Sequence, residues 1–121
     1  MLRYSDTLEG LRTRLQSLPV PGDEHAFFNH VVIDSRQVTS GDLFVALRGE
    51  RNEGYRFIPQ AIERGATGII TDSLPEKMPS DGATTVFLVD NSLAALQQLA
   101  KFWRSKHNVI VIGITGSVGK T

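Results

Sequence analysis

Apolar residues recur along this chain with two different spacings, one helical and one extended. The first helical pattern is a row of leucines three or four residues apart: Leu8, Leu11, Leu15 and Leu18. This row predicts an amphipathic helix with Ser5 or Asp6 as its N-cap and with Pro19 just beyond its end.

Short apolar runs rich in β-branched residues predict buried strands at 30–34, 43–47, 68–71 and 85–89. Two further helices lie between or after them. One is predicted around residues 57–65, and the other follows the cap candidates Asp90 and Asn91. The apolar side of this last helix is expected to hold Leu93, Leu96, Leu99, Ala100 and Trp103. Strands that alternate with helices predict an α/β domain with a parallel or mixed sheet.

A further apolar strand is predicted at 109–112, and it runs directly into glycine-rich sequence. The helix before it closes one α/β unit, so we expect a domain boundary near residue 108. The organisation predicted is a small N-terminal α/β domain at 1–108, followed at 109–121 by the first strand and the glycine-rich loop of a second domain.

Composition narrows the function classes. The chain has 121 residues, with 13 Lys and Arg against 13 Asp and Glu, and it has no cysteine. Disulfides, thiolate metal sites and cysteine nucleophiles are thereby excluded, and the balanced charge argues against a nucleic-acid binder. The first 20 residues carry several charges, and no apolar run approaches the ~20 residues that span a bilayer. We expect a monomeric cytoplasmic protein.

The sequence Gly-Ile-Thr-Gly-Ser-Val-Gly-Lys-Thr at 113–121 resembles a phosphate-binding loop. In such loops glycines let backbone N–H groups face phosphate oxygens, a lysine contacts the β- and γ-phosphates, and the next hydroxyl holds Mg²⁺. The match is imperfect, because Gly113 lies one residue earlier than the pattern requires. An ordinary strand-to-helix turn is the alternative interpretation.

The form of this loop resembles the ATP loop of the Mur ligases, which build the peptidoglycan precursor. The resemblance implies that residues 109–121 are the first strand and phosphate-binding loop of a Rossmann-like ATPase domain, truncated at that loop. Upstream blocks resemble the N-terminal domain of the same family: Ile-Asp-Ser-Arg (33–36), Gly-Asp-Leu-Phe-Val-Ala-Leu (41–47), Gly-Glu-Arg (49–51) and Glu-Gly-Tyr-Arg-Phe-Ile (53–58). Within the family, the sequence of these motifs is most similar to that of the member that adds D-Ala-D-Ala to UDP-MurNAc-tripeptide. The sequence departs from the family at Tyr55, where histidine is common.

The resemblance implies a bacterial enzyme of peptidoglycan precursor synthesis, and therefore of cell-wall biogenesis, cell shape and cell division. ATP would convert the carboxylate of the UDP-linked peptide into an acyl phosphate, which the incoming amine attacks. The residues implied for ATP are Thr115, Gly116, Ser117, Val118, Gly119, Lys120 and Thr121. Lys120 would act in catalysis and Thr121 would ligate Mg²⁺, whereas Ser35 and Arg36 would bind the UDP-MurNAc-peptide.

Three alternatives stay open at this point. The chain could resemble the sibling ligase that adds the third amino acid, it could be a binding module for the UDP substrate without catalysis, or it could be a fragment of an unrelated phosphate-loop NTPase. By spacing alone, Asp34, Ser35 and Arg36 also fit a simple turn after a strand. Since no helix follows Thr121, we expect this chain alone to bind ATP poorly or not at all. Since the amine-substrate domain of the family and its later catalytic residues are missing, we also expect the chain alone to be inactive.

Overall fold

The computed structural model describes residues 2–17, 19, 27–47, 54–75 and 84–106, and its centre is a four-stranded parallel sheet. In spatial order the strands are β3 (Val31–Val32), β4 (Leu43–Val45), β5 (Gly68–Thr71) and β6 (Thr85–Leu88). Leu43 of β4 pairs with Val31 on one side and with Gly68 on the other. The spatial order follows the order in the chain, so each strand is laid beside the one before it.

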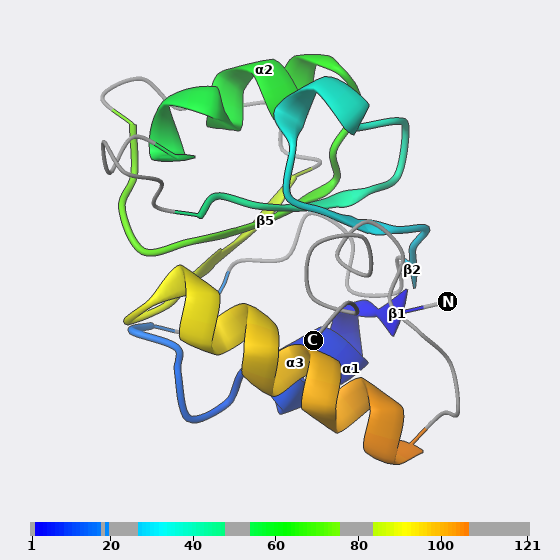
Figure 1. Ribbon diagram of the computed structural model, residues 1–121, viewed down its shortest axis with the longest axis vertical. Coiled ribbons are helices and arrows are strands. Elements are labelled where there is room, and N and C mark those ends of the chain that lie inside the picture. Colours follow the sequence, from blue (N-terminus) through cyan, green and yellow to red (C-terminus); the bar gives the residue numbers. More distant parts are fainter. Residues whose placement is uncertain (1, 18, 20–26, 48–53, 76–83, 107–121) are drawn as a thin grey trace, which may run out of the picture.

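Helices cover both faces of this sheet, as Figure 1 shows. One face carries the short 3₁₀ helices η1 (Ser35–Gln37) and η2 (Gly54–Phe57) together with α2 (Ile58–Glu63). The other face carries α1 (Tyr4–Gly10) and α3 (Ser92–Lys106), which pack against each other. A separate two-stranded antiparallel ribbon is formed by β1 (Leu2–Arg3) and β2 (Phe27–Phe28).

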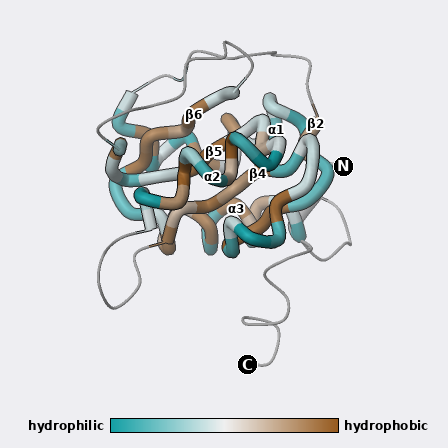
Figure 2. Tube along the Cα trace, turned by 90° about the horizontal axis from the view of Figure 1, so that it is seen from above, coloured by the Kyte–Doolittle hydropathy of each residue, from teal (hydrophilic) through white to brown (hydrophobic). Residues whose placement is uncertain are grey.

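The core consists of two apolar clusters separated by the sheet, because successive strand residues point to opposite faces. Leu43 and Val45 of β4 belong to the cluster under α1 and α3, whereas Phe44 between them belongs to the cluster under α2. Ile70 and Ile69 of β5 divide in the same way. In Figure 2 the hydrophobic strands accordingly lie between more hydrophilic outer segments.

The predicted α/β class and parallel sheet are confirmed, and each of the four strands predicted at 30–34, 43–47, 68–71 and 85–89 is present. The last described helix is also confirmed. One detail of its buried face was wrong, because Leu93 is 50% exposed while Ala95 is fully buried. Ser92, one residue earlier, is 1% exposed, so the first turn already faces the core and Leu93 lies on its outer side.

The first predicted helix is shorter than its leucine pattern indicates. Helix α1 begins at Tyr4 with Arg3 as its N-cap, and Asp6 accepts a hydrogen bond from the Arg3 N–H (3.3 Å), so the predicted caps were wrong. After Gly10 the chain leaves the helix, and Leu15 forms an antiparallel bridge with Val89. Pairing with the end of β6 therefore overrides the helical spacing.

The ribbon of β1 and β2 was not predicted. Two-residue strands are too short to show an alternating pattern, and this pairing joins segments about 25 residues apart in the sequence. None of the helices in the described part of the chain is long and apolar enough to cross a membrane. The predicted second domain at 109–121 lies outside the described residues.

Candidate functional site

The candidate site is built on the turn that follows β3, at the carboxyl edge of the parallel sheet. Asp34 is the N-cap of η1, and its Oδ1 accepts the backbone N–H of Arg36 at 2.9 Å. Its own carbonyl accepts the N–H of Gln37 at 2.9 Å. Ligands of parallel α/β sheets bind at this edge, and the turn places Ser35 and Arg36 there.

Ser35 faces inward from this turn. Its side chain is 6% exposed, and its Oγ donates a hydrogen bond of 2.8 Å to Oε1 of Gln60 on α2. Gln60 itself is exposed. The bond therefore ties η1 to α2 and connects a buried hydroxyl to an amide at the surface.

Arg36 faces outward. Its side chain is 80% exposed, and its guanidinium donates to both carboxylate oxygens of Asp34, from Nε at 3.1 Å and from Nη2 at 2.9 Å. These hydrogen bonds hold the pKa of Asp34 below its ordinary value and raise the pKa of Arg36. Because a guanidinium has five N–H donors, those not used by Asp34 are oriented and available to an anion.

The neighbouring strand ends are occupied by structural hydrogen bonds. Asp72, directly after β5, accepts the backbone N–H of Ser92 at 3.2 Å, and Asn91 accepts that of Ala94 at 2.9 Å. These two side chains cap α3. Asp72 therefore serves the packing of the second helix layer.

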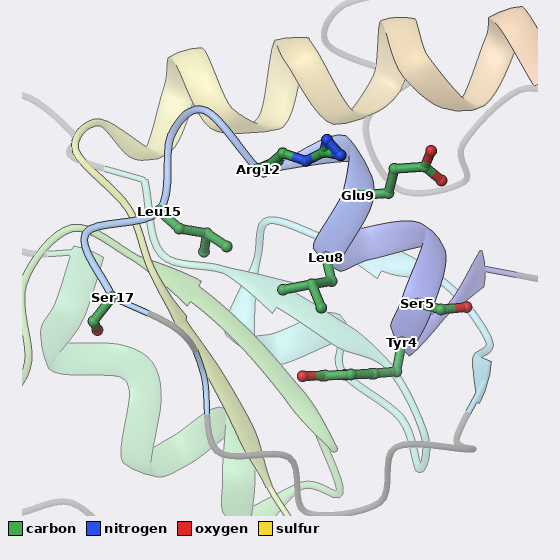
Figure 3. A pocket seen from close by; sticks show the side chains of 7 residues that line it. All are labelled: Tyr4, Ser5, Leu8, Glu9, Arg12, Leu15 and Ser17. Carbon is green, nitrogen blue, oxygen red and sulfur yellow. The ribbon is translucent and has the colours of Figure 1, made fainter.

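A pocket of about 570 Å³ lies elsewhere, beside α1 (Figure 3). Its side chains have both apolar and polar character: Tyr4, Ser5, Leu8, Glu9, Arg12, Leu15 and Ser17. Since α1 and η1 cover opposite faces of the sheet, this pocket does not include the predicted substrate residues.

Tyr55, the position where the sequence departs from the family, is half-buried and packs against the cluster under α2. It therefore contributes to the same helix layer as Gln60. Gln60 is the residue of this site that sequence reasoning missed. It lies 25 positions from Ser35, and only the packing of α2 against η1 brings the two together.

The predicted ATP residues and the Mg²⁺ ligand Thr121 lie outside the described residues. Within the described ranges, acidic and histidine side chains form no group of three or more that could hold a metal ion. Around the turn after β3, the described residues provide hydrogen-bonding groups on Ser35 and Gln60 and an exposed cation on Arg36.

Comparison with known proteins agrees with this architecture. The family described as Mur ligase family, catalytic domain, matches residues 28–104. A UDP-N-acetylmuramoyl-tripeptide–D-alanyl-D-alanine ligase from Synechocystis is 43% identical over 118 residues, which cover 95% of this chain and 26% of that protein. A UDP-N-acetylmuramoyl-L-alanyl-D-glutamate–2,6-diaminopimelate ligase from Bacteroides fragilis is 34% identical over 115 residues, 94% of this chain and 24% of that protein.

Solved structures of the same family share the fold. MurF from Acinetobacter baumannii aligns with a TM-score of 0.66 and 25% identity, over 87% of this chain and 21% of that chain. MurF from Thermotoga maritima, determined in complex with ADP, aligns with a TM-score of 0.53 and 35% identity, over 64% of this chain and 17% of that chain. The chain thus spans about a quarter of the length of the curated relatives it matches, and it belongs to the Mur ligase family.

Proposed function

We infer that this chain is the UDP-substrate-binding part of an ATP-dependent ligase that adds D-Ala-D-Ala to UDP-MurNAc-tripeptide. Relatives named for that reaction are 43% and 40% identical to it, whereas those named for adding diaminopimelate are 34% and 36% identical. These identities favour the D-Ala-D-Ala ligase over its sibling.

The observation that carries the proposal is the outward-facing guanidinium of Arg36 at the carboxyl edge of the sheet. Asp34 fixes this side chain through two hydrogen bonds, so less rotamer entropy is lost when an anion binds. The free N–H donors suit the oxygens of a diphosphate. The exposed amide of Gln60, which the buried hydroxyl of Ser35 contacts, lies on the adjoining side of this turn and offers a polar group for the nucleoside.

The second half of the proposal concerns the loop at 113–121. Its residues offer a lysine ammonium and a hydroxyl, the donor set that phosphate and Mg²⁺ require. We assign Lys120 to the β- and γ-phosphates and Thr121 to Mg²⁺. ATP, when bound, supplies the phosphoryl group that activates the substrate carboxylate.

The test is isothermal titration of this chain with UDP and with uridine. We expect UDP to bind more tightly than uridine, because only UDP carries the diphosphate. Arg36→Ala should weaken the binding of UDP by about tenfold or more and leave the binding of uridine nearly unchanged, since charge-assisted hydrogen bonds contribute ~1.5–3 kcal/mol. Arg104→Ala, which removes an exposed arginine of α3, is the matched control. Absence of UDP binding, or equal affinity for UDP and uridine, would contradict the proposal.

A further inference from the structure

Ser35 and Gln60 form a hydrogen-bonded pair whose two members differ sharply in exposure. Ser35 is 6% exposed, whereas Gln60 is exposed on α2. A buried hydroxyl has little surface left for a ligand, whereas an exposed amide can still contact one. We propose that Gln60 is the base-specificity residue of this site, that its side-chain Nε2 donates a hydrogen bond to the 4-carbonyl of uracil, and that Ser35 is the positioning residue that orients it. This inference rests on the proposed binding of UDP.

The direction of the hydrogen bond decides which end of the amide is available. Ser35 Oγ donates to Gln60 Oε1, so the carbonyl end of the amide is turned toward η1 and is occupied. The NH₂ group is at the opposite end of the same planar amide. Within the part of the chain that the structure describes, the Gln60 side chain makes no second hydrogen bond. Because this end of the amide points away from Ser35 and Gln60 is exposed, we expect its N–H donors to face a ligand.

A donor at this position distinguishes uracil from cytosine. Uracil carries a carbonyl acceptor at C4, where cytosine carries an amino group. An N–H donor of Gln60 can bond to the uracil carbonyl. With cytosine, the same N–H would face an amino group, which is also a donor, so one of the two donors would be left without an acceptor. A fixed amide orientation is needed for this selection, because an amide that is free to flip would present its oxygen and accept the cytosine amine.

Phe57 adds a surface on which the base can stack. It is 50% exposed and precedes Gln60 by three positions, which places the two on neighbouring parts of the helix surface. Proteins often bind a single base by stacking it on an exposed aromatic ring and by hydrogen bonding to its edge. The stacking accepts any base, so the hydrogen bond to the edge supplies the selectivity.

The first experiment changes only the ligand and needs no variant. Isothermal titration of the chain with UDP, CDP and 4-thio-UDP compares a carbonyl, an amine and a thiocarbonyl at C4. We expect CDP to bind about tenfold more weakly than UDP, and 4-thio-UDP to be weakened because sulfur is a poorer acceptor. Equal affinities for UDP and CDP would overturn the inference while leaving UDP binding intact. Failure to bind UDP at all would instead overturn the proposed function as well.

The second experiment replaces the hydrogen-bond donor of Gln60 by an acceptor. Gln60→Glu keeps an acceptor for Ser35 but replaces the NH₂ group by a carboxylate oxygen, so the UDP-to-CDP affinity ratio should fall by about tenfold. Gln97→Glu introduces the same charge on the exposed side of α3 and should leave the ratio unchanged. An unchanged ratio in Gln60→Glu would contradict the specificity role.

The positioning role of Ser35 has its own readout. Ser35→Ala frees the amide to flip, so the UDP-to-CDP ratio should approach one, whereas Ser35→Thr retains the hydroxyl and should restore the preference for UDP. A purely structural role would lower the stability of both variants without changing the ratio. A ratio that stays at its wild-type value in Ser35→Ala would therefore exclude the positioning role.

Discussion

Gly10 at the end of α1 lies so close to Leu99 of α3 that a Cβ added to the glycine would be 2.8 Å from Leu99 Cδ1. The same atom would be 2.9 Å from Phe102 Cδ2. A side chain larger than glycine fits here only if Leu99 and Phe102 move, so glycine allows the close packing of α1 and α3. Its weak helix propensity also favours the end of α1 at this position.

Gly10→Ala should destabilise the protein, although alanine is the better helix former by about 1 kcal/mol. The added methyl group overfills the contact between α1 and α3, and we expect a net loss of about 1–3 kcal/mol in the free energy of unfolding. Urea denaturation measures this loss. A Gly10→Ala, Leu99→Ala double variant should lose less than the sum of the single variants, because the clash is removed. A stability equal to wild type in Gly10→Ala would contradict this packing.

Gln98 on α3 fastens the turn after α1. Its Nε2 donates to the Gly10 carbonyl at 3.0 Å and to Thr13 Oγ1 at 2.9 Å, and its Oε1 accepts from Arg14 Nε at 3.2 Å. Gln98→Ala should cost about 1–3 kcal/mol of unfolding free energy, measured by thermal denaturation. The neighbouring Gln97 is exposed, so Gln97→Ala should change stability by no more than about 0.5 kcal/mol. Equal effects of the two substitutions would show that these bonds contribute nothing.

Asp42 is a buried carboxylate that stabilises the turn before β4. It is 1% exposed and accepts the Thr39 N–H at 2.8 Å and the Thr39 hydroxyl at 2.9 Å, and its other oxygen lies 3.0 Å from His30 Nδ1. Asp42→Ala leaves these donors without their acceptor and should cost about 3 kcal/mol in urea denaturation. Asp90→Ala removes an exposed ion pair with Arg14 and should cost less than about 1 kcal/mol. If Asp42→Ala lowered the free energy of unfolding by no more than Asp90→Ala does, this role of Asp42 would be contradicted.

The pair of Asp34 and Arg36 predicts a pH dependence with a definite sign. Hydrogen bonds from Arg36 lower the pKa of Asp34 in the folded protein from its ordinary value of 3.8. The pair therefore stabilises the folded state fully at pH values above 3.8, and this stabilisation is lost as the pH falls through the lowered pKa of Asp34 in the folded state. Arg36→Gln should move the Asp34 pKa upward toward 3.8, as followed by NMR of the carboxyl carbon. Arg104→Gln should not move it. An unchanged titration in Arg36→Gln would show that the pair is absent in solution.

Much of the fold follows from local pattern. The strands at 68–71 and 85–89 were predicted because continuous apolar runs between turn residues leave few other possibilities, and the long helix of residues 92–106 because its apolar residues repeat at helical spacing. The motif around Asp34, Ser35 and Arg36 was also visible in the sequence, and its turn geometry is set locally by the Asp34 cap.

Other features depend on contacts between segments that are distant in the chain. Leu15 has the spacing of a helix residue, yet it pairs with Val89 because a partner strand offers backbone hydrogen bonds that a helix end leaves unmade. Ser35 and Gln60 are 25 positions apart, and no periodicity connects them. The α/β class and the candidate turn could be predicted without a structure, since both depend on residues that are neighbours in the chain. Only the packing of α2 against η1 determined that a buried serine orients an exposed glutamine, because that contact depends on distant segments meeting.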